Sequence, residues 1–255
     1  MGLRISMDGR AALIVGANRG IGLGFVQHLL KQNPETQVYA TYRNPATAED
    51  LLTLERSIPT LTCFAMDATE EGEIAQTVAK IQARGDSLTL VINCVGILHD
   101  GDFQPEKSLR QIDADNLLRY FQVNSIPTVL LAKHLQPLLQ TSDRSVFATI
   151  SAKIGSIEDN RLGGWYGYRA SKAALNMFLK TIAIEYSRKN PNTVVVALHP
   201  GTTDTGLSKP FQKNVPPEKL FSVERTVGQL MAIINDAVKE DSGSFFSWDG
   251  SRLPW

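Results

Sequence analysis

The chain has 255 residues, 43% of them hydrophobic, and carries 26 basic and 26 acidic side chains. This length and apolar content suit one large α/β core, and no linker divides the chain, so we expect a single domain over residues 1–255. The balanced charge, without a long run of either sign, excludes an extended basic surface for nucleic acid or anionic membranes. We therefore expect small-molecule partners, no nucleic acid and no membrane.

The chain begins "MGLRISMDGRAALIVGA", in which a short apolar run leads directly into a glycine-rich turn without a signal-peptide cleavage pattern. No apolar stretch reaches the roughly 18 residues of a membrane span. The cysteines are Cys63 and Cys94, a low number that indicates either a reduced compartment or no structural role for sulfur. These features predict a cytoplasmic protein.

Short apolar runs alternate with amphipathic stretches along the chain. Strands are expected at residues 11–15, 37–42, 61–66, 88–93, 145–150, 193–198 and 243–247, and helices at 21–32, 46–57, 70–84, 113–139, 168–189 and 223–239. The alternation indicates βαβ units, and nearly continuous apolar strands suit a parallel sheet that is covered on both faces. The predicted fold is α/β: a Rossmann-type, doubly wound parallel sheet of about seven strands with helices on both faces.

In such a sheet, ligands bind beyond the carboxyl ends of the strands. Glycine or polar residues follow the predicted strands at Gly16 to Gly22, Arg43, Asp67, Asn93 to Gly96, Ser151, and Pro200 to Thr205. One ligand could contact all of them. The segment 206–221, "GLSKPFQKNVPPEKLF", has three prolines and little pattern, and we expect it to form a lid over the site.

The first turn reads "GANRGIG", from Gly16 to Gly22. Its glycines permit a tight turn and let backbone N–H groups and a helix N-terminus approach a pyrophosphate. The spacing is Gly-x-x-x-Gly-x-Gly and lacks the Gly-Lys-Ser/Thr of a triphosphate-binding loop. A dinucleotide site is favoured, and a glycine-rich turn without a ligand is the alternative.

The residues after the second strand bear on the choice of dinucleotide. In dinucleotide sites, an acidic residue about 20 positions beyond the glycines binds the ribose 2′-hydroxyl, whereas an arginine accommodates a 2′-phosphate. Here the strand ends "YATYRNP", with Arg43 and no carboxylate, and Arg19 lies in the glycine turn. The pattern favours NADP(H) over NAD(H), unless both arginines are ordinary solvated charges.

The stretch "WYGYRASKAAL" pairs a tyrosine with a lysine. In a helix, residues four apart share a face, so Tyr168 and Lys172 stack while Tyr166 points elsewhere. Taken alone, the pair could also be a tyrosine packed under a lysine stem. Trp165 and Tyr166 read as an apolar wall of a substrate pocket or as surface packing.

Other chemistries find little support in the sequence. The histidines are dispersed over different elements, which disfavours a metal site: they are His28, His99, His134 and His199. No Gly-x-Ser-x-Gly elbow is present, which disfavours a hydrolase.

The glycine turn, Asn93, Tyr168 and Lys172, in this order, resemble the short-chain dehydrogenase/reductase family in its classical form. The stretches "GSIEDNRLGGWYGYRASKAALN", "HPGTTDT" and "WDGSRLPW" resemble its C-factor-like and carbonyl-reductase-like members, and the resemblance spans essentially the whole chain. It implies an NADP(H)-dependent oxidoreductase that transfers a hydride between the nicotinamide and a small carbonyl or secondary alcohol. The alternative is a C-factor-like, cofactor-binding signalling or regulatory protein with little turnover.

The resemblance also assigns roles to residues. It implies that Tyr168 is the general acid/base, that Lys172 holds the ribose, and that Asn124 positions a water beside Lys172. An ammonium one helical turn away is expected to lower the pKa of Tyr168. The implied cofactor-binding residues are Gly16, Asn18, Arg19, Gly20, Ile21, Gly22, Arg43, Asp67, Ala68, Asn93, Gly96, Tyr168, Lys172, Pro200, Gly201, Thr203 and Thr205, while Val15 replaces a usual threonine.

The family also uses a serine to hold the substrate carbonyl. The fifth strand, "SVFATISAKIGSI", offers Ser151, but registering it on Gly155 places the usual serine position at Ala152. A shift of one residue reverses the face of a strand. We predict Ser151 as the donor; Ser156 is a further candidate, and absence of the donor is the alternative.

The two long helices carry small or apolar outer residues such as Ala170, Ala174 and Met177. In this family such helices pair between subunits, which implies a homodimer or homotetramer. Packing within the chain is the alternative.

Overall fold

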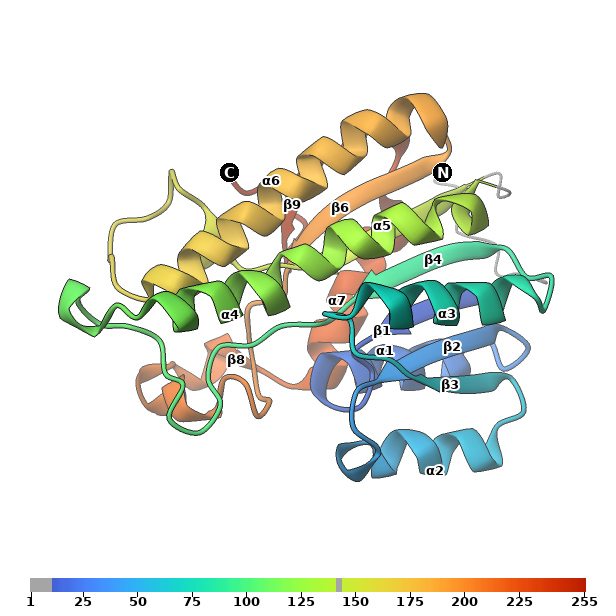
Figure 1. Ribbon diagram of the computed structural model, residues 1–255, viewed down its shortest axis with the longest axis horizontal. Coiled ribbons are helices and arrows are strands. Elements are labelled where there is room, and N and C mark those ends of the chain that lie inside the picture. The colour runs from blue at the N-terminus through green and yellow to red at the C-terminus, as the bar shows by residue number, and fades with distance from the viewer. Residues whose placement is uncertain (1–10, 141–143) are drawn as a thin grey trace.

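The computed structural model describes residues 11–140 and 144–255. The expectation about targeting rests partly on residues 1–10, which lie outside the described part. Seven parallel strands form the central sheet in the order β3-β2-β1-β4-β5-β6-β9 (Figure 1). The strands are β1 (Ala11–Val15), β2 (Gln37–Tyr42), β3 (Leu61–Ala65), β4 (Leu88–Asn93), β5 (Ser145–Ile150), β6 (Thr193–His199) and β9 (Ser244–Ser247). The predicted fold class is confirmed.

Helices cover both faces of this sheet. The helices are α1 (Gly20–Gln32), α2 (Glu49–Ser57), α3 (Glu71–Gln82), α4 (Ala114–Asn124), α5 (Ile126–Leu139), α6 (Tyr166–Lys189) and α7 (Val223–Asp236). Successive strand residues point to opposite faces. Leu13 therefore packs in the core with α3, α5 and α6, while Ile14 packs in the core with α1, α2 and α7.

The helices differ from their predicted bounds by up to three residues at an end, and one of them is divided in two. The expected helix 113–139 divides at Ser125, whose backbone (φ −116°, ψ −57°) departs from helical values, and Pro127 opens the second part. Proline is well tolerated in a first helical turn, because it has no N–H to leave unpaired. Helix α6 begins at Tyr166 and therefore includes Gly167 ahead of Tyr168.

A second, two-stranded sheet joins β7 (Thr202–Thr203) to β8 (Leu220–Phe221). The sequence did not predict these strands, because two residues are too few to show a periodicity. The pair fixes the two ends of segment 206–221, which contains the short 3₁₀ helices η4 (Lys209–Asn214) and η5 (Pro217–Lys219). Among residues 11–140 and 144–255, no helix has the length and apolar content to cross a membrane.

Candidate active site

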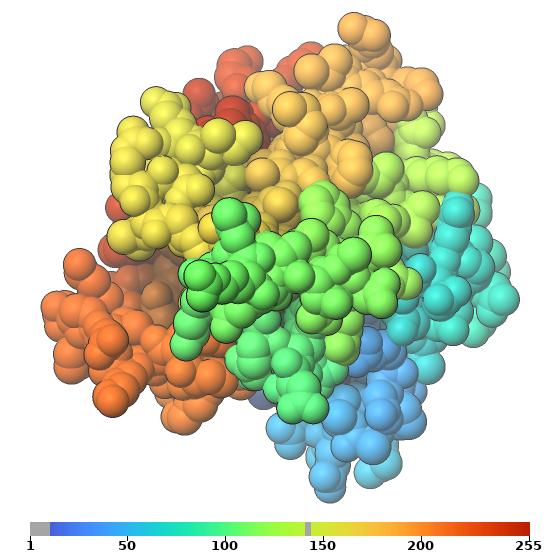
Figure 2. All heavy atoms as spheres, turned by 60° about the vertical axis from the view of Figure 1, so that its left-hand side comes forward, coloured from blue at the N-terminus to red at the C-terminus, as the bar shows by residue number. Residues whose placement is uncertain are grey.

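A cavity of about 1110 Å³ runs along the carboxyl edge of the central sheet. It is walled by the segments that follow β1, β2, β3, β4, β5 and β6 and by the start of α6. The segments after β4, β5 and β6 come together on one face of the molecule (Figure 2). All the predicted site residues line this cavity except Asn93 and Asn124. Residues from distant parts of the sequence thus share one continuous space.

The glycine turn forms the floor of one end of the cavity. Gly16 and Gly20 have φ values of +76° and +55°, which favour glycine. A Cβ on Gly22 would lie 2.2 Å from the carbonyl oxygen of Gly16, so a side chain is excluded there. Helix α1 begins in this turn without a side-chain cap and without an acidic residue in its first turn. Its free N–H groups suit a phosphate.

Thr41, at the end of β2, supports the turn. Its Oγ1 accepts a hydrogen bond from the Gly16 N–H (3.1 Å), and its carbonyl accepts one from the Ala17 N–H (2.7 Å). Val15 replaces the usual threonine and has no side-chain hydrogen-bonding group, and the sequence did not predict the role of Thr41. Its contribution depends on the register of β1 with β2, which a local motif does not reveal.

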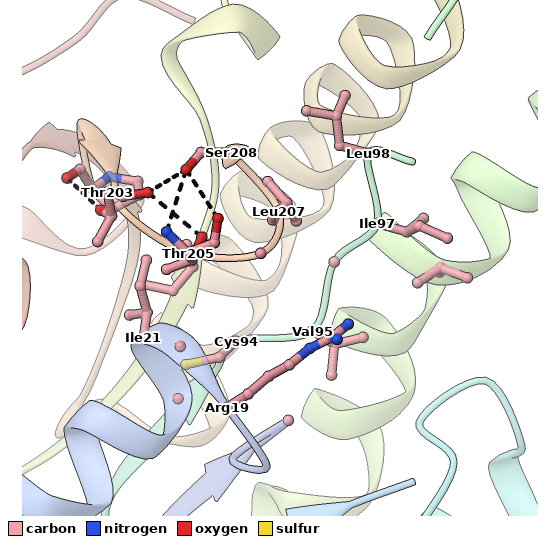
Figure 3. A pocket seen from close by; sticks show the side chains of 18 of the residues that line it. Arg19, Ile21, Cys94, Val95, Ile97, Leu98, Thr203, Thr205, Leu207 and Ser208 are labelled. Carbon is pink, nitrogen blue, oxygen red and sulfur yellow. Dashed lines mark hydrogen bonds between the residues drawn. The ribbon is translucent and has the colours of Figure 1, made fainter. Parts of the chain in front are cut away.

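The two arginines flank the same end of the cavity. Arg19 and Arg43 line it and are exposed, and neither forms an ion pair with any residue in 11–140 or 144–255. Arg19 extends beside Cys94 and Val95 in the close-up (Figure 3). Asp67 also lines the cavity, but its Oδ1 already accepts bonds from the N–H and the hydroxyl of Thr69. The charge at this end is therefore favourable for a phosphate group.

Tyr168 and Lys172 lie one turn apart on α6 and are both buried. Tyr168 lines the cavity, and its hydroxyl has no hydrogen-bond partner within the described residues. Lys172 Nζ lies 6.0 Å from the centroid of the Tyr168 ring and donates to the carbonyl of Ile150 (3.0 Å). A Cβ on Gly155 would approach the Lys172 Cβ to 2.7 Å, so a glycine is needed against α6 at this point.

Burial dominates the proton affinities of this pair. It raises the pKa of the Tyr168 phenol above its ordinary value of 10.0, and no effect of Lys172 offsets it. The sequence led us to expect a lowered pKa for Tyr168. The difference arises because the Lys172 ammonium points at the Ile150 carbonyl and is itself destabilised by burial. Burial lowers the pKa of Lys172 from 10.5 to about 8, with a smaller opposing influence from Cys94. In the protein alone, Tyr168 is a protonated phenol at neutral pH.

Two asparagines brace the site from behind the cavity wall. Asn124, at the end of α4, accepts from the Ile97 N–H (2.7 Å) and donates to the Ile97 carbonyl and to Ser171 Oγ (3.0 Å each). Asn93 donates to Thr128 Oγ1 (2.9 Å) and accepts from the Val95 N–H (3.1 Å). Both connect the loop after β4 to the surrounding helices. The predicted water beside Asn124 stays a prediction.

At the end of β5, successive side chains point in different directions. Ser151 borders the cavity, but its side chain is buried and its Oγ donates to Asn176 Oδ1 (2.6 Å) on α6. Ala152 packs with Ile154 against the cluster that contains Tyr168. Ser156 Oγ donates to the carbonyl of Trp255 and does not line the cavity. Ser151 as the substrate donor stays a prediction, and it requires the bond to Asn176 to be given up or shared.

Aromatic side chains close the cavity over Tyr168. The Trp165 ring contacts Tyr168 edge-on (6.2 Å between centroids) and also Phe211 (4.9 Å), while Tyr166 lies outside the cavity. His99 Nε2 lies 3.2 Å from the carbonyls of both Gly206 and Leu207. Thr203 and Thr205, just before segment 206–221, are linked by hydrogen bonds to each other and to Ser208 within it (Figure 3). Segment 206–221 therefore covers this end of the cavity.

Fold and site together define a dinucleotide-binding α/β domain. The family model for short chain dehydrogenases matches residues 10–216. NADPH-bound carbonyl reductase from chicken fatty liver has a TM-score of 0.87 and 30% identity, over 100% of this chain and 96% of that chain. Short chain dehydrogenase gsfK of Penicillium aethiopicum is 30% identical, over 95% of this chain and 98% of that protein. The C-signal of Myxococcus xanthus is 28% identical, over 58% of this chain and 84% of that protein.

The chain belongs to the short-chain dehydrogenase/reductase family and is an oxidoreductase of that family. The predicted resemblance is confirmed, including its carbonyl-reductase-like and C-factor-like aspects.

Proposed function

We propose that the protein is an NADP(H)-dependent reductase of small carbonyl compounds, which also runs in reverse on secondary alcohols. One observation carries the proposal: a single cavity joins the glycine turn at one end to the Tyr168 phenol and Lys172 at the other. The similar chicken carbonyl reductase binds NADPH. A ligand that spans this cavity would place its phosphates on the turn and its reactive ring beside the phenol.

The residues at both ends fit such a cofactor. The N–H groups at the start of α1 would hold the pyrophosphate, and Arg19 and Arg43 would hold a 2′-phosphate. Asp67 and Ala68 would contact the adenine, and Pro200, Gly201, Thr203 and Thr205, which line the same cavity, would contact the carboxamide. When bound, the cofactor supplies or accepts the hydride.

Tyr168 supplies the proton in the proposed reaction. The Tyr168 phenol carries its proton at neutral pH and can donate it to the carbonyl oxygen as negative charge develops there. Burial raises the pKa of Tyr168 and so makes it a weaker acid in the protein alone. The buried ammonium of Lys172, 6.0 Å from the Tyr168 ring, would hold the ribose of the cofactor. Asn124 fixes the loop beside Gly96, where a Cβ would approach both Asn124 Oδ1 and Lys172 Nζ to 3.5 Å.

The proposal is tested by mixing purified protein and NADPH with a panel of aldehydes, ketones and quinones while the NADPH absorbance is followed. We expect oxidation of NADPH, and we expect Tyr168→Phe to lower kcat by about 100-fold or more while NADPH still binds. An unchanged rate in this variant would remove Tyr168 from the mechanism.

A second candidate function is cofactor-dependent signalling or regulation with little turnover. It is favoured by the alanine at position 152 and by the engagement of Ser151 with Asn176, which leave the Tyr168 side of β5 without a hydroxyl. Tight NADPH binding by the parental protein without oxidation of any carbonyl would support this candidate and contradict the reductase.

We also propose that the protein forms a homodimer through the outer face of α4 and α6. These helices pack together and expose Leu118 (67%), Met177 (66%) and Ile184 (50%). Met177 and Ile184 are seven residues apart and share a face of α6, and apolar side chains that share an exposed face indicate an interface more often than isolated ones do.

A further inference from the structure

The loop between β4 and α4 buries a carboxylate. Glu106 is only 3% exposed and does not line the cavity. Its Oε2 accepts a hydrogen bond from the Gly167 N–H (3.1 Å), whereas its buried Oε1 has no hydrogen-bond partner in the part of the chain that is described. No cation of the described residues pairs with it. A buried carboxylate is costly without compensation, so its surroundings must stabilise it in another way.

The N-terminus of α6 provides that compensation. This helix begins after Trp165 with no side-chain cap of its own and no acidic residue in its first turn. The first N–H groups of a helix lack partners within the helix and favour a negative charge. Glu106 supplies both acceptors and negative charge at this end of the helix. Its backbone carbonyl accepts a hydrogen bond from the Trp165 N–H (2.5 Å), and its carboxylate accepts one from the Gly167 N–H. A distant segment therefore caps the helix.

Close packing ties this cap to the catalytic tyrosine. A Cβ on Gly167 would lie 2.3 Å from the Tyr120 ring and 3.0 Å from Glu106 Oε1, so the backbone at this position packs closely against both residues. Tyr168 is the next residue, and its ring contacts that of Tyr120 edge-on at 6.1 Å. A displacement of the first turn would therefore move the phenol.

We propose that Glu106 is a positioning residue: by capping α6 through Gly167, it fixes the Tyr168 phenol in the cavity. The inference rests on the proposed role of Tyr168. Glu106 touches neither the cavity nor the reacting atoms, so it acts only through the backbone of the first turn. Displacements of about 1 Å in a catalytic group can cost up to about 100-fold in rate.

The test compares Glu106→Ala and Glu106→Gln with Asp102→Asn, which removes an exposed carboxylate from the same loop. The measurements are kcat, KM for a carbonyl that the parental protein reduces, Kd for NADPH, and amide hydrogen exchange of residues 163–172. We expect Glu106→Ala to lower kcat about 10-fold with KM and Kd within about twofold, and to speed exchange in the first turn of α6. The kcat and the exchange rates of Glu106→Gln should lie between those of Glu106→Ala and the parental protein, since the glutamine amide oxygen can still accept a hydrogen bond from the Gly167 N–H but carries no charge. Asp102→Asn should match the parental protein.

Glu106→Gln keeps the shape of the side chain, so it tests the proposal even if Glu106→Ala does not fold. The proposal is overturned if kcat of the folded variants stays within about twofold of the parental value, or if kcat falls only in proportion to the folded fraction. Absence of turnover in the parental protein would instead contradict the proposed function. The exchange measurement then still decides, because unchanged exchange at residues 163–172 in Glu106→Gln overturns the cap.

Discussion

Lys172 is a buried lysine whose charge is stabilised by the carbonyl of Ile150. Its pKa is about 8 in the folded protein, against an ordinary value of 10.5. Between these values the unfolded chain binds more protons, so this residue makes the folded state more stable as pH rises from about 8 to 10.5. Below pH 8 the cost of burying the charge is present in full.

We therefore predict that Lys172→Met stabilises the protein by about 1–3 kcal/mol at about pH 7 and by much less at about pH 10. Urea unfolding at both values measures the difference, with the exposed Lys189→Met as the control. An equal effect at both pH values would mean that burial does not depress the pKa of Lys172.

Ala152 is the residue at the end of β5 that packs beside Tyr168. If this side of the strand lacks a substrate donor, Ala152→Ser should raise kcat by about 10-fold, because a single oxyanion donor contributes about 100-fold or more in well-aligned sites. Ala152→Cys, with a similar size but a weak donor, should leave the rate near the parental value. Steady-state kinetics compare the three proteins, and equal rates would favour Ser151 as the donor.

Arg43 is exposed and lines the cavity. We predict that Arg43→Asp weakens NADPH binding by about 10-fold or more and improves NADH binding, since it replaces a phosphate-binding cation with an acceptor for the 2′-hydroxyl. Titrations with NADPH and NADH measure the ratio of their dissociation constants. Arg56→Asp, at an exposed position on α2, serves as the control. If the ratio does not change, a 2′-phosphate is held elsewhere.

The turn between β1 and α1 has no room for a side chain at its third glycine, Gly22. Gly22→Ala would force a Cβ against the carbonyl of Gly16, so we predict a loss of about 2 kcal/mol or more in unfolding free energy and weaker NADPH binding. Gly72 in α3 has open space around it, and Gly72→Ala should stabilise by about 0.5–1 kcal/mol. Thermal and denaturant unfolding test the pair; equal effects would contradict the clash.

Most strands and helices could be predicted from the sequence, whereas contacts between distant segments could not. The seven strands and the start of α1 follow from apolar runs and glycine spacing, which are local signals. Hydrophobic periodicity alone does not reveal the break between α4 and α5 at Ser125, because hydrophobic residues continue on both sides of it. The direction of the Ser151 hydroxyl and the cap from Glu106 depend on packing between segments far apart in sequence, which periodicity does not encode.

For the whole molecule, the exposed apolar face of α4 and α6 predicts self-association. We expect the protein to sediment as a dimer, and we expect the double substitution Leu118→Glu and Met177→Glu to yield a folded monomer, because it places charges on that face. The exposed Leu162→Glu, in the loop before α6, is the matched control. A parental monomer at micromolar concentration would contradict the proposed interface.

Trp165 is the one non-glycine residue with a positive φ in the described chain (φ +51°, ψ +45°). Holding a large residue in that conformation costs on the order of 1 kcal/mol, which glycine would avoid. The indole nevertheless forms the wall between Tyr168 and Phe211. Selection for thermal resistance should consequently favour glycine at position 165, whereas selection for tight discrimination among ligands should favour the large aromatic side chain.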